Sequence, residues 1–236
     1  MDTGSSVTRL RKAMSAIWQE TFGDDADYVD RYLENYDADD NRIVICKQDE
    51  VVAFLHYHRF DTGDFTASYI FGVVTVPHYR GSGIARGMIS GAMKCMNQHG
   101  DIFAMLIAEE ESLRSWYATM GFAALSETPV RVSGSDGLSF DNDDTNLNIA
   151  LYRIVNVERY LELYASRHAE ACFDVMFIDG MIPANNACYS VARGRVQVSD
   201  WNCDNYRRMS PGELLLTYPI ECNVSEIIIP TSSSSQ

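Results

Sequence analysis

The sequence predicts a mixed α/β fold, in which a twisted mixed sheet is flanked by helices and followed by a small α+β region. Strand and helix patterns alternate between residues 65 and 120, which predicts a sheet with a parallel pair at its centre. Residues 102–108 form a continuous apolar run, as expected for a strand covered on both faces. Residues 133–148 are crowded with Gly, Ser, Asp and Asn, and further strand and helix patterns follow them.

The first half of the chain begins with helical spacing and continues with strands. Apolar residues recur every three or four positions from Leu10 to Trp18, and Gly23 ends this helix. A second helix runs to Tyr36, with its apolar residues on one side. In chain order we then expect strands at 42–47, 51–60 and 65–76, a helix at 82–98, a strand at 102–108 and a helix at 113–120.

The last third of the chain shows a second set of elements. We expect a strand at 147–155, a helix at 157–166 capped by Asn156, strands at 173–178 and 189–198, a short helix opened by Ser210 and Pro211, and an edge strand at 227–229. The composition therefore predicts a first domain over 1–130, a linker loop over 131–148 and a second domain over 149–230. Residues 231–236 are polar, and we expect them to be disordered.

Charge and composition limit the partners. The 236 residues carry a formal net charge of −14, which argues against nucleic acid and anionic membranes as partners. This charge suits a cationic substrate such as an amine, or it serves solubility alone. No apolar run approaches the roughly 20 residues that span a bilayer, and residues 1–6 lack the apolar core of a signal peptide, so we expect a cytoplasmic protein. The six cysteines form no CxxC pair and no cluster with histidine, so we expect no metal site and mostly reduced cysteines.

The segment 72–86 carries the clearest chemical signal. An apolar strand runs into a glycine-containing turn, which leads directly into an amphipathic helix. The first turn of a helix offers unpaired N–H groups at the positive end of the helix dipole, and Gly81 and Gly83 let the backbone approach an anion closely. Arg80 and Arg86 add positive charge in a strongly acidic chain. These features predict a phosphate-binding site, with an ordinary tight turn as the alternative.

Two short patterns identify the kind of phosphate site. Neither the P-loop nor the dinucleotide fingerprint fits, because the lysine of the first and the glycine spacing of the second are missing. The pattern Arg80-x-x-Gly83-x-Ala85 is instead similar to the pyrophosphate motif Gln/Arg-x-x-Gly-x-Gly/Ala of the GNAT acetyltransferase superfamily. The sequence from Tyr117 to Phe122 resembles the Tyr-x-x-x-Gly-Phe signature of that superfamily. The resemblance covers residues 42–122 and implies a GNAT fold with acetyl-CoA as co-substrate.

The resemblance implies a role for each matching position. The backbone of Val73, Val74 and Thr75 is expected to pair with the pantetheine arm as if it were an added strand. The cofactor pyrophosphate is expected to contact the turn and the first helical turn, at Arg80, Gly81, Ser82, Gly83, Ile84, Ala85 and Arg86. Tyr117 is expected to lie near the thioester sulfur and to protonate the departing thiolate, with a core aromatic residue as the alternative.

One position departs from the superfamily pattern. Many members have an asparagine seven residues before the tyrosine, where it bonds the pantetheine, but this chain has Glu110. We expect Glu110 to face the substrate amine and to take part in catalysis. An alkylammonium with a pKa of about 10 must lose a proton before it attacks, which requires a base. The candidates for this base are Glu109, Glu110, Glu111, His56, His58 and Tyr69.

The C-terminal third carries a second resemblance. Residues 150–158 are similar to the opening of a sterol carrier protein-like domain, in which an arginine-containing strand leads into a helix. Such a domain follows the acetyltransferase region in the enhanced-intracellular-survival family of aminoglycoside N-acetyltransferases. That family has two acetyltransferase-like regions before the carrier domain, whereas this chain has room for one. Its C-terminal carboxylate is the catalytic base, a role that we do not assign to the polar tail 231–236.

These observations predict an acetyl-CoA-dependent N-acetyltransferase. The acetyl group is expected to move to a primary amine of a small, cationic acceptor by direct attack, without a covalent enzyme intermediate. An aminoglycoside is one candidate acceptor, and the sequence leaves the acceptor, the acyl group and the oligomeric state open. The alternative is a catalytically weak protein that binds an acyl-CoA or a hydrophobic ligand.

Overall fold

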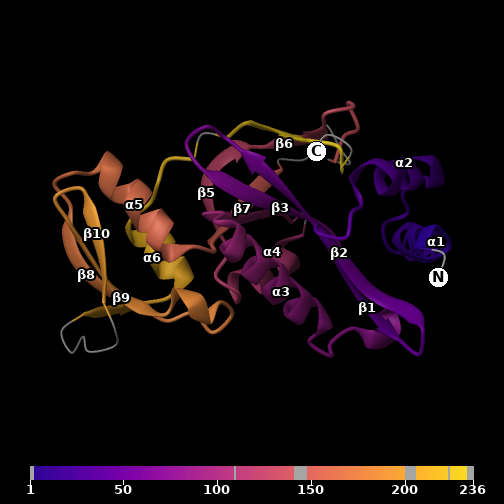
Figure 1. The fold of residues 1–236 in the computed structure, drawn as a ribbon, viewed down its shortest axis with the longest axis horizontal. Helices are drawn as coiled ribbons and strands as arrows, with labels where there is room; N and C mark the ends of the chain where they lie inside the picture. The colour runs from indigo at the N-terminus through magenta and orange to yellow at the C-terminus, as the bar shows by residue number, and fades with distance from the viewer. Residues whose placement is uncertain (1–2, 109, 141–147, 200–205, 223, 233–236) are drawn as a thin grey trace.

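The structure is a computed structural model that describes residues 3–108, 110–140, 148–199, 206–222 and 224–232. It contains a six-stranded mixed sheet flanked by helices, a smaller four-stranded sheet with two helices, and a two-stranded sheet (Figure 1). The smaller sheet lies at the end of the molecule opposite the two N-terminal helices. The predicted mixed α/β fold is confirmed.

The six-stranded sheet has the order β1-β2-β3-β4-β7-β5. Its strands are β1 (Arg42–Lys47), β2 (Glu50–Asp61), β3 (Thr66–Thr75), β4 (Phe103–Ile107), β7 (Ile149–Ile154) and β5 (Ala123–Pro129). β3 and β4 run parallel, and every other neighbouring pair in this sheet is antiparallel. The predicted parallel pair at the centre of the sheet is therefore confirmed.

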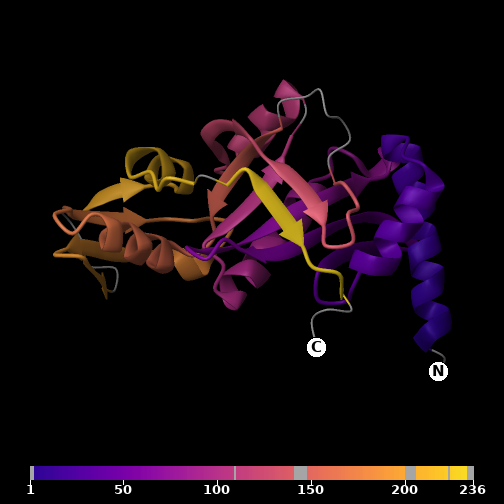
Figure 2. The same ribbon diagram turned by 90° about the horizontal axis from the view of Figure 1, so that it is seen from above.

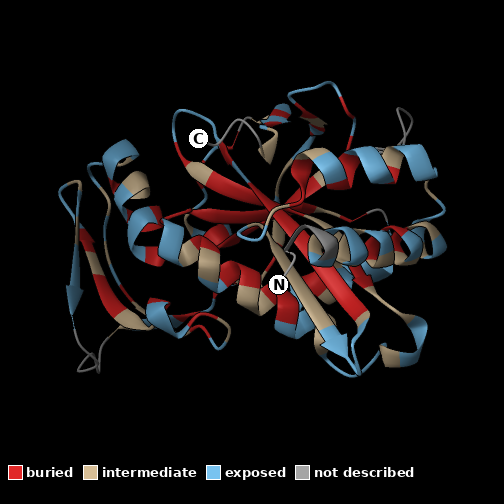
Figure 3. Ribbon diagram, turned by 45° about the vertical axis from the view of Figure 1, so that its right-hand side comes forward, coloured by how far each residue is buried: buried red, intermediate tan, exposed pale blue. Residues whose placement is uncertain are grey.

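Helices cover both faces of this sheet. α1 (Thr3–Phe22) and α2 (Ala26–Tyr36) pack on one face, and α3 (Ile84–His99) and α4 (Glu111–Ala118) pack on the other. The alternation along β2 sets the two layers, because Phe54 and Phe60 belong to the core under α1 and α2, whereas Leu55 and Tyr57 pack with α3. Figure 3 shows the buried residues gathered in the central strands, while the helices present exposed residues outward.

The second unit is built from the C-terminal elements. These are α5 (Val157–Arg167), β8 (Cys172–Phe177), β9 (Ala187–Ala192), β10 (Arg195–Ser199), β11 (Arg207–Met209) and α6 (Pro211–Thr217), with sheet order β10-β9-β8-β11. As predicted, Asn156 caps α5, and its side chain accepts from the N–H of Arg159. Ser210 opens α6 with a capping box to Glu213. Short 3₁₀ turns occur at Pro77–Tyr79 and Pro183–Asn185.

The structure differs from the sequence expectation around residue 149. β7 was expected to open the second domain, but it pairs with β4 and β5 inside the six-stranded sheet. The expected linker 131–148 contains β6 (Arg131–Gly134), which pairs in parallel with β12 (Glu226–Ile229). Figure 2 shows β12 lying beside β6, so the end of the chain returns to the first unit. These strands are hard to predict from their turn-rich composition, because their hydrogen bonds come from partner strands far along the chain.

Two further expectations need correction. The strand expected at 189–198 is a hairpin of β9 and β10 that turns at Arg193 and Gly194, both with positive φ. Cys188 is disulfide-bonded to a partner outside the described residues, whereas reduced cysteines were expected. Cys46, Cys95, Cys172 and Cys222 are free, as expected. Of the tail expected to be disordered, positions 233–236 lie outside the described residues.

Candidate active site

The two central parallel strands separate at the predicted cofactor segment. β3 and β4 pair from Ala67–Phe103 to Tyr69–Met105, and their pairing ends there. The second half of β3 continues beside β2 alone, with Val74 opposite Phe54. The strand edge that carries Val73, Val74 and Thr75 therefore faces the gap between the diverging strands. A backbone edge without a strand partner is the geometry that an extended ligand requires.

Gly72 fixes a bulge at the start of this edge. Its φ is +58°, and the β2–β3 register shifts between Phe54 and His56 on the facing strand. A Cβ at Gly72 would lie 2.7 Å from the ring of Trp18 on α1. The Trp18 ring is itself fixed, because its Nε1 donates to Asp24 at 2.7 Å. Only glycine fits both the backbone conformation and this close approach.

The turn after β3 leaves the start of α3 open. Gly83 is the N-cap of α3, with φ +82°, and no side chain caps the helix. A Cβ at Gly81 or at Gly83 would meet no atom of the described residues within 4 Å, so both positions border open space. The first N–H groups of α3 thus lack a side-chain partner and face an open surface. This combination suits a phosphate group.

Polar contacts shape the turn itself. Arg80 donates from Nε to the carbonyl oxygen of Thr75 at 2.9 Å, and Ser82 donates from Oγ to the carbonyl oxygen of Tyr79 at 2.6 Å. The hydroxyl of Thr75 is buried without a partner among the described residues. An orphaned hydroxyl beside uncapped helix amides fits a ligand that brings hydrogen-bonding groups to this edge. The residues expected to hold coenzyme A therefore fit such a group.

Tyr117 lies on the last turn of α4. Its ring is 7% exposed and packs edge-on against Trp116 at 4.9 Å and Phe122 at 5.7 Å. Burial raises the pKa of Tyr117 to about 12, so the phenol stays protonated in the physiological range. Two residues further on, the hydroxyl of Thr119 accepts from Arg86 Nη2 at 2.5 Å. This bond joins the end of α4 to the first turn of α3 and brings the two predicted motifs together.

Glu110 begins the same helix that ends near Tyr117. It is the N-cap position of α4, its side chain is exposed, and its Oε2 accepts from Ser112 Oγ at 3.1 Å. Seven residues at about 1.5 Å each separate Glu110 from Tyr117 by roughly 10 Å along α4. Glu111 is exposed in the first turn of α4, and Glu109 lies outside the described residues.

The structure does not bring the two candidate histidines to this open edge. His56 and His58 are 0% and 4% exposed, and they stack under α1 and α2 with ring centroids 6.3 Å apart. Burial lowers the pKa of both, that of His58 to about 3. The third candidate, Tyr69, is 3% exposed and stacks on Phe71 in the same core. None of the three is exposed enough to meet an acceptor in this conformation.

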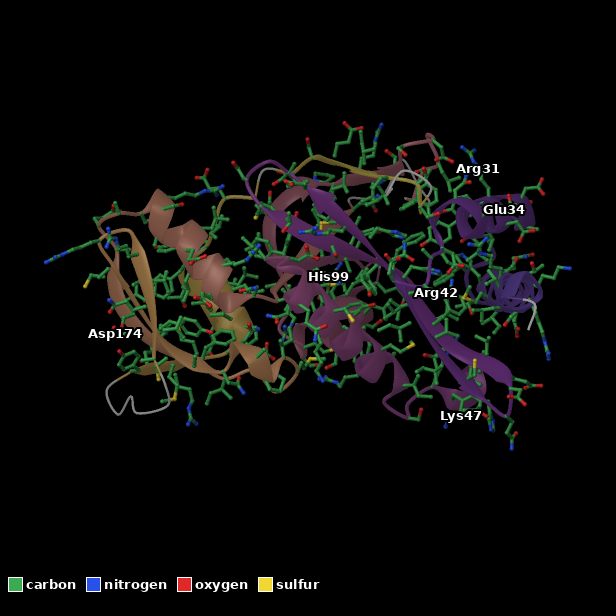
Figure 4. The ribbon with its side chains drawn as sticks, viewed as in Figure 1. Arg31, Glu34, Arg42, Lys47, His99 and Asp174 are labelled. Atoms are coloured by element: carbon green, nitrogen blue, oxygen red, sulfur yellow. The ribbon has the colours of Figure 1, made fainter. Side chains whose placement is uncertain are left out.

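Sequence reasoning missed the group that holds His56 in place. Asp37 is 1% exposed and accepts from Arg11 Nε at 2.9 Å, from Arg42 Nη1 at 2.8 Å and from His56 Nε2 at 3.1 Å. These partners keep the pKa of Asp37 well below its usual range, against the effect of burial, which raises it. Arg42, labelled in Figure 4, reaches Asp37 from β1. Asp37 belongs to an Asp-rich turn, where the sequence offers no signal that separates it from its exposed neighbours.

A cavity of about 380 Å³ lies next to Arg86, between the two units. The first unit contributes Arg86, the end of α4 and Arg153, and the second unit contributes Asp179, Gly180, Met181 and the start of α6. Arg153 is also a residue that sequence reasoning assigned no role in the site. Within the described ranges, no group of three or more His, Cys, Asp or Glu side chains is arranged to hold a metal ion. No described helix combines the length and the apolar character that crossing a membrane requires.

Comparisons with known proteins concern the family and the fold. Residues 9–125 match the family model described as an acetyltransferase (GNAT) domain. No curated protein matches the sequence. A GCN5-related N-acetyltransferase from Anabaena variabilis has 12% identity and a TM-score of 0.61, and the match covers 95% of this chain and 97% of that one. Eis1 from Mycobacterium abscessus has 11% identity and a TM-score of 0.60, with 89% of this chain and 87% of that one covered.

A third similar structure is a GCN5-related N-acetyltransferase from Kribbella flavida, with 14% identity, a TM-score of 0.58 and coverage of 87% of this chain and 86% of that one. At these identities the likeness concerns the fold, which extends over both units of the chain. The family match over residues 9–125 is what supports a GNAT acetyltransferase domain in the first unit, and with it an acyltransferase.

Proposed function

We propose that this acyltransferase moves the acetyl group of acetyl-CoA to a primary amine by direct attack of the amine nitrogen on the thioester carbonyl. The observations that support the proposal are three features of neighbouring elements, two of which the bond from Arg86 to Thr119 connects. These are the open edge of β3, the uncapped start of α3 and the buried tyrosine at the end of α4. When bound, acetyl-CoA supplies the activated acetyl group, and the chain supplies binding, orientation and proton control.

The cofactor assignment rests on the part of β3 that has no pairing with β4 and on the start of α3, which no side chain caps. In the proposal, the edge at Val73, Val74 and Thr75 binds the pantetheine arm, and the N–H groups from Gly81 to Arg86 bind the pyrophosphate. The side chains of Arg80 and Arg86 add positive charge beside these amides. The orphaned hydroxyl of Thr75 and the empty space in front of Gly83 support this placement.

Tyr117 is proposed to assist the departure of the thiolate. As the amine nitrogen forms its bond to the carbonyl carbon, the carbon–sulfur bond breaks and the sulfur takes the electron pair. A thiol has a pKa of about 8.5, so complete proton transfer from a phenol of pKa about 12 is uphill. Tyr117 therefore acts mainly as a hydrogen-bond donor to the sulfur, and it remains available as such up to strongly alkaline pH.

Glu110 is proposed as the group that receives the proton of the amine. A separation of roughly 10 Å from Tyr117 exceeds the distance across a reacting thioester and amine, so this proton would pass through at least one water. The formal net charge of −14 supports a cationic acceptor. Aminoglycosides are one class of polyamine to test, because the sequence resembles an aminoglycoside-modifying family and the fold resembles Eis1.

We also propose that the second unit is the sterol carrier protein-like domain suggested by residues 150–158. A small sheet covered by α5 supports this reading. Its inner side chains, including Val175, Phe177 and Val191, are almost fully buried among themselves. This filled core favours a unit that forms a wall of the site over one that carries a lipid.

The decisive experiment measures thiol release from acetyl-CoA with a panel of primary amines, aminoglycosides included. We expect turnover by the wild type and a loss of about 100-fold in kcat for Tyr117→Phe, with cofactor affinity unchanged by calorimetry. Tyr164→Phe in the second unit is the matched control and should keep full activity. Equal rates for Tyr117→Phe and wild type would remove Tyr117 from the mechanism. Absence of coenzyme A binding would refute the cofactor assignment and leave a hydrophobic-ligand protein as the alternative.

A further inference from the structure

A buried arginine joins the second unit to the turn that follows Tyr117. Arg153 lies on β7 and is 1% exposed. Its guanidinium donates to the carbonyl oxygen of Met120 at 2.6 Å through Nε and to that of Ile154 at 3.1 Å through Nη1. Its Nη2 donates to Asp179 Oδ1 at 2.7 Å. All three guanidinium nitrogens are therefore engaged, and one planar group sets the distances between three segments of the chain.

The second unit holds Asp179 rigidly. Asp179 follows β8 and is 1% exposed. Besides Arg153, its Oδ1 accepts from the N–H groups of Met181 at 2.9 Å and Ile182 at 3.1 Å, and its Oδ2 accepts from Asn185 Nδ2 at 3.2 Å. The carboxylate is thus fixed by the loop that follows β8. The position of Arg153 is in turn determined by the second unit.

Two backbone hydrogen bonds connect the turn held by Arg153 to Tyr117. The N–H of Met120 donates to the carbonyl oxygen of Tyr117 at 2.9 Å, and the N–H of Phe122 donates to the same oxygen at 3.3 Å. Between them, Gly121 has φ +87°, and a Cβ there would lie 3.1 Å from Pro211 and 3.5 Å from Arg153 Nε. The turn that ends α4 is therefore held between a side chain of β7 and the first residue of α6.

We infer that Arg153, held by Asp179, is a positioning residue that fixes the Tyr117 hydroxyl relative to the thioester. The inference rests on the proposed function. A buried ion pair stabilises a fold no better than well-packed apolar side chains do, so its presence calls for a geometric reason. Near a reacting centre, displacement of a contributing group by about 1 Å costs on the order of 100-fold in rate. The second unit thereby contributes to catalysis through Asp179, in addition to forming a wall of the site.

A double-mutant cycle tests the inference. Arg153→Lys keeps the charge but replaces the planar guanidinium by a single ammonium group, which cannot reproduce the three contacts. We expect kcat to fall about 10-fold, with KM for acetyl-CoA within about two-fold of the wild-type value. In the Tyr117→Phe background the same substitution should cause no further fall, because the hydroxyl that it misplaces is already absent. Arg59→Lys, which alters an ion pair to the equally buried Asp101 away from α4, is the matched control and should keep full kcat in both backgrounds.

The outcomes separate this inference from the proposed function. An equal fall in kcat with and without the Tyr117 hydroxyl would overturn the positioning role, because the effect would then not act through Tyr117. Unchanged kcat in Arg153→Lys would overturn it as well. If circular dichroism shows that Arg153→Lys does not fold, Asp179→Asn replaces it in the double-mutant cycle, because asparagine has the same shape as the native aspartate. Absence of turnover by the wild type would refute the proposed function, and this inference with it.

Discussion

Arg86 donates from its guanidinium to the hydroxyl of Thr119 at 2.5 Å, although 33 residues separate them in the chain. The bond connects the proposed phosphate-binding turn at the start of α3 to the end of α4, two residues after Tyr117. The proposed cofactor segment and the tyrosine are thus directly linked in the fold.

Removal of the Arg86 side chain should weaken cofactor binding more than it slows the chemical step. Arg86→Ala deletes a positive charge beside the proposed pyrophosphate site, and one charge-assisted contact contributes about 1.5–3 kcal/mol. We expect the dissociation constant for coenzyme A, measured by calorimetry, to rise by about 10-fold or more. Lys94→Ala removes an exposed charge further along α3 and is the control. An equal change in both variants would mean that only net charge matters.

Gly83 and Gly87 form a matched pair for testing the turn. Gly83 has φ +82°, so Gly83→Ala should destabilise the fold by about 1–2 kcal/mol and shift the amides proposed to bind the phosphate. Gly87 lies inside α3 with nothing within 4 Å of an added Cβ, so Gly87→Ala should stabilise by about 0.5–1 kcal/mol. Urea unfolding and coenzyme A titration measure the two effects. Weakened binding in Gly87→Ala, or unchanged binding in Gly83→Ala, would contradict the assignment of the helix start.

Replacement of Glu110 distinguishes a base from a binding group. If Glu110 relays the amine proton, Glu110→Gln should lower kcat and remove the acidic limb of its pH profile, with little change in cofactor affinity. If it contacts the pantetheine instead, KM for acetyl-CoA should change and the profile should keep its shape. Glu111→Gln, in the adjacent exposed position, serves as the control. Wild-type kinetics in Glu110→Gln would exclude both roles.

The buried histidines should make the protein sensitive to acid. His58 has a pKa of about 3 in the folded state and about 6.5 when unfolded, so between these values the unfolded chain binds a proton that the folded chain excludes. Stability is therefore complete above about pH 6.5 and falls as the pH drops, by at most about 1.4 kcal/mol per unit for this residue. Urea unfolding between pH 7 and pH 4.5 measures the slope.

His58→Gln should flatten this dependence at the cost of some stability at pH 7, because the side chain of His58 bonds Tyr32 at 2.7 Å. His99→Gln is the control, since His99 is exposed (labelled in Figure 4). The same slope in His58→Gln as in wild type would mean that other groups determine the acid sensitivity.

The strand-to-helix turn of the site could be predicted from the sequence, because its conformation depends on residues that are neighbours in the chain. Gly81 and Gly83 adopt the positive φ values that a strand-to-helix turn of this kind requires. The burial of His56 and His58 was also open to prediction, because they alternate with Leu55 and Tyr57 and share the face of β2 that carries Phe54 and Phe60.

Other parts of the site depend on contacts that no local pattern encodes. The strand at 149–154 was recognised, but its neighbours in the sheet are decided by packing over the whole first unit. The ion pair of Arg153 with Asp179 spans 26 positions, and the pattern at 150–158 that contains Arg153 does not indicate its partner. Asp37 accepts hydrogen bonds from two arginines and a histidine that belong to three different elements. Such sites arise where separate elements meet.

The return of β12 to β6 has a practical consequence for dissecting the protein. The second unit is inserted between two strands, β7 and β12, that both belong with the first unit. A gene fragment ending at residue 148 would leave β4 and β5 without the strand between them, and an unpaired strand edge promotes aggregation. A fragment starting at residue 149 would carry that strand without neighbours. The two halves of the coding sequence are therefore better suited to co-expression as complementing pieces than to separate purification.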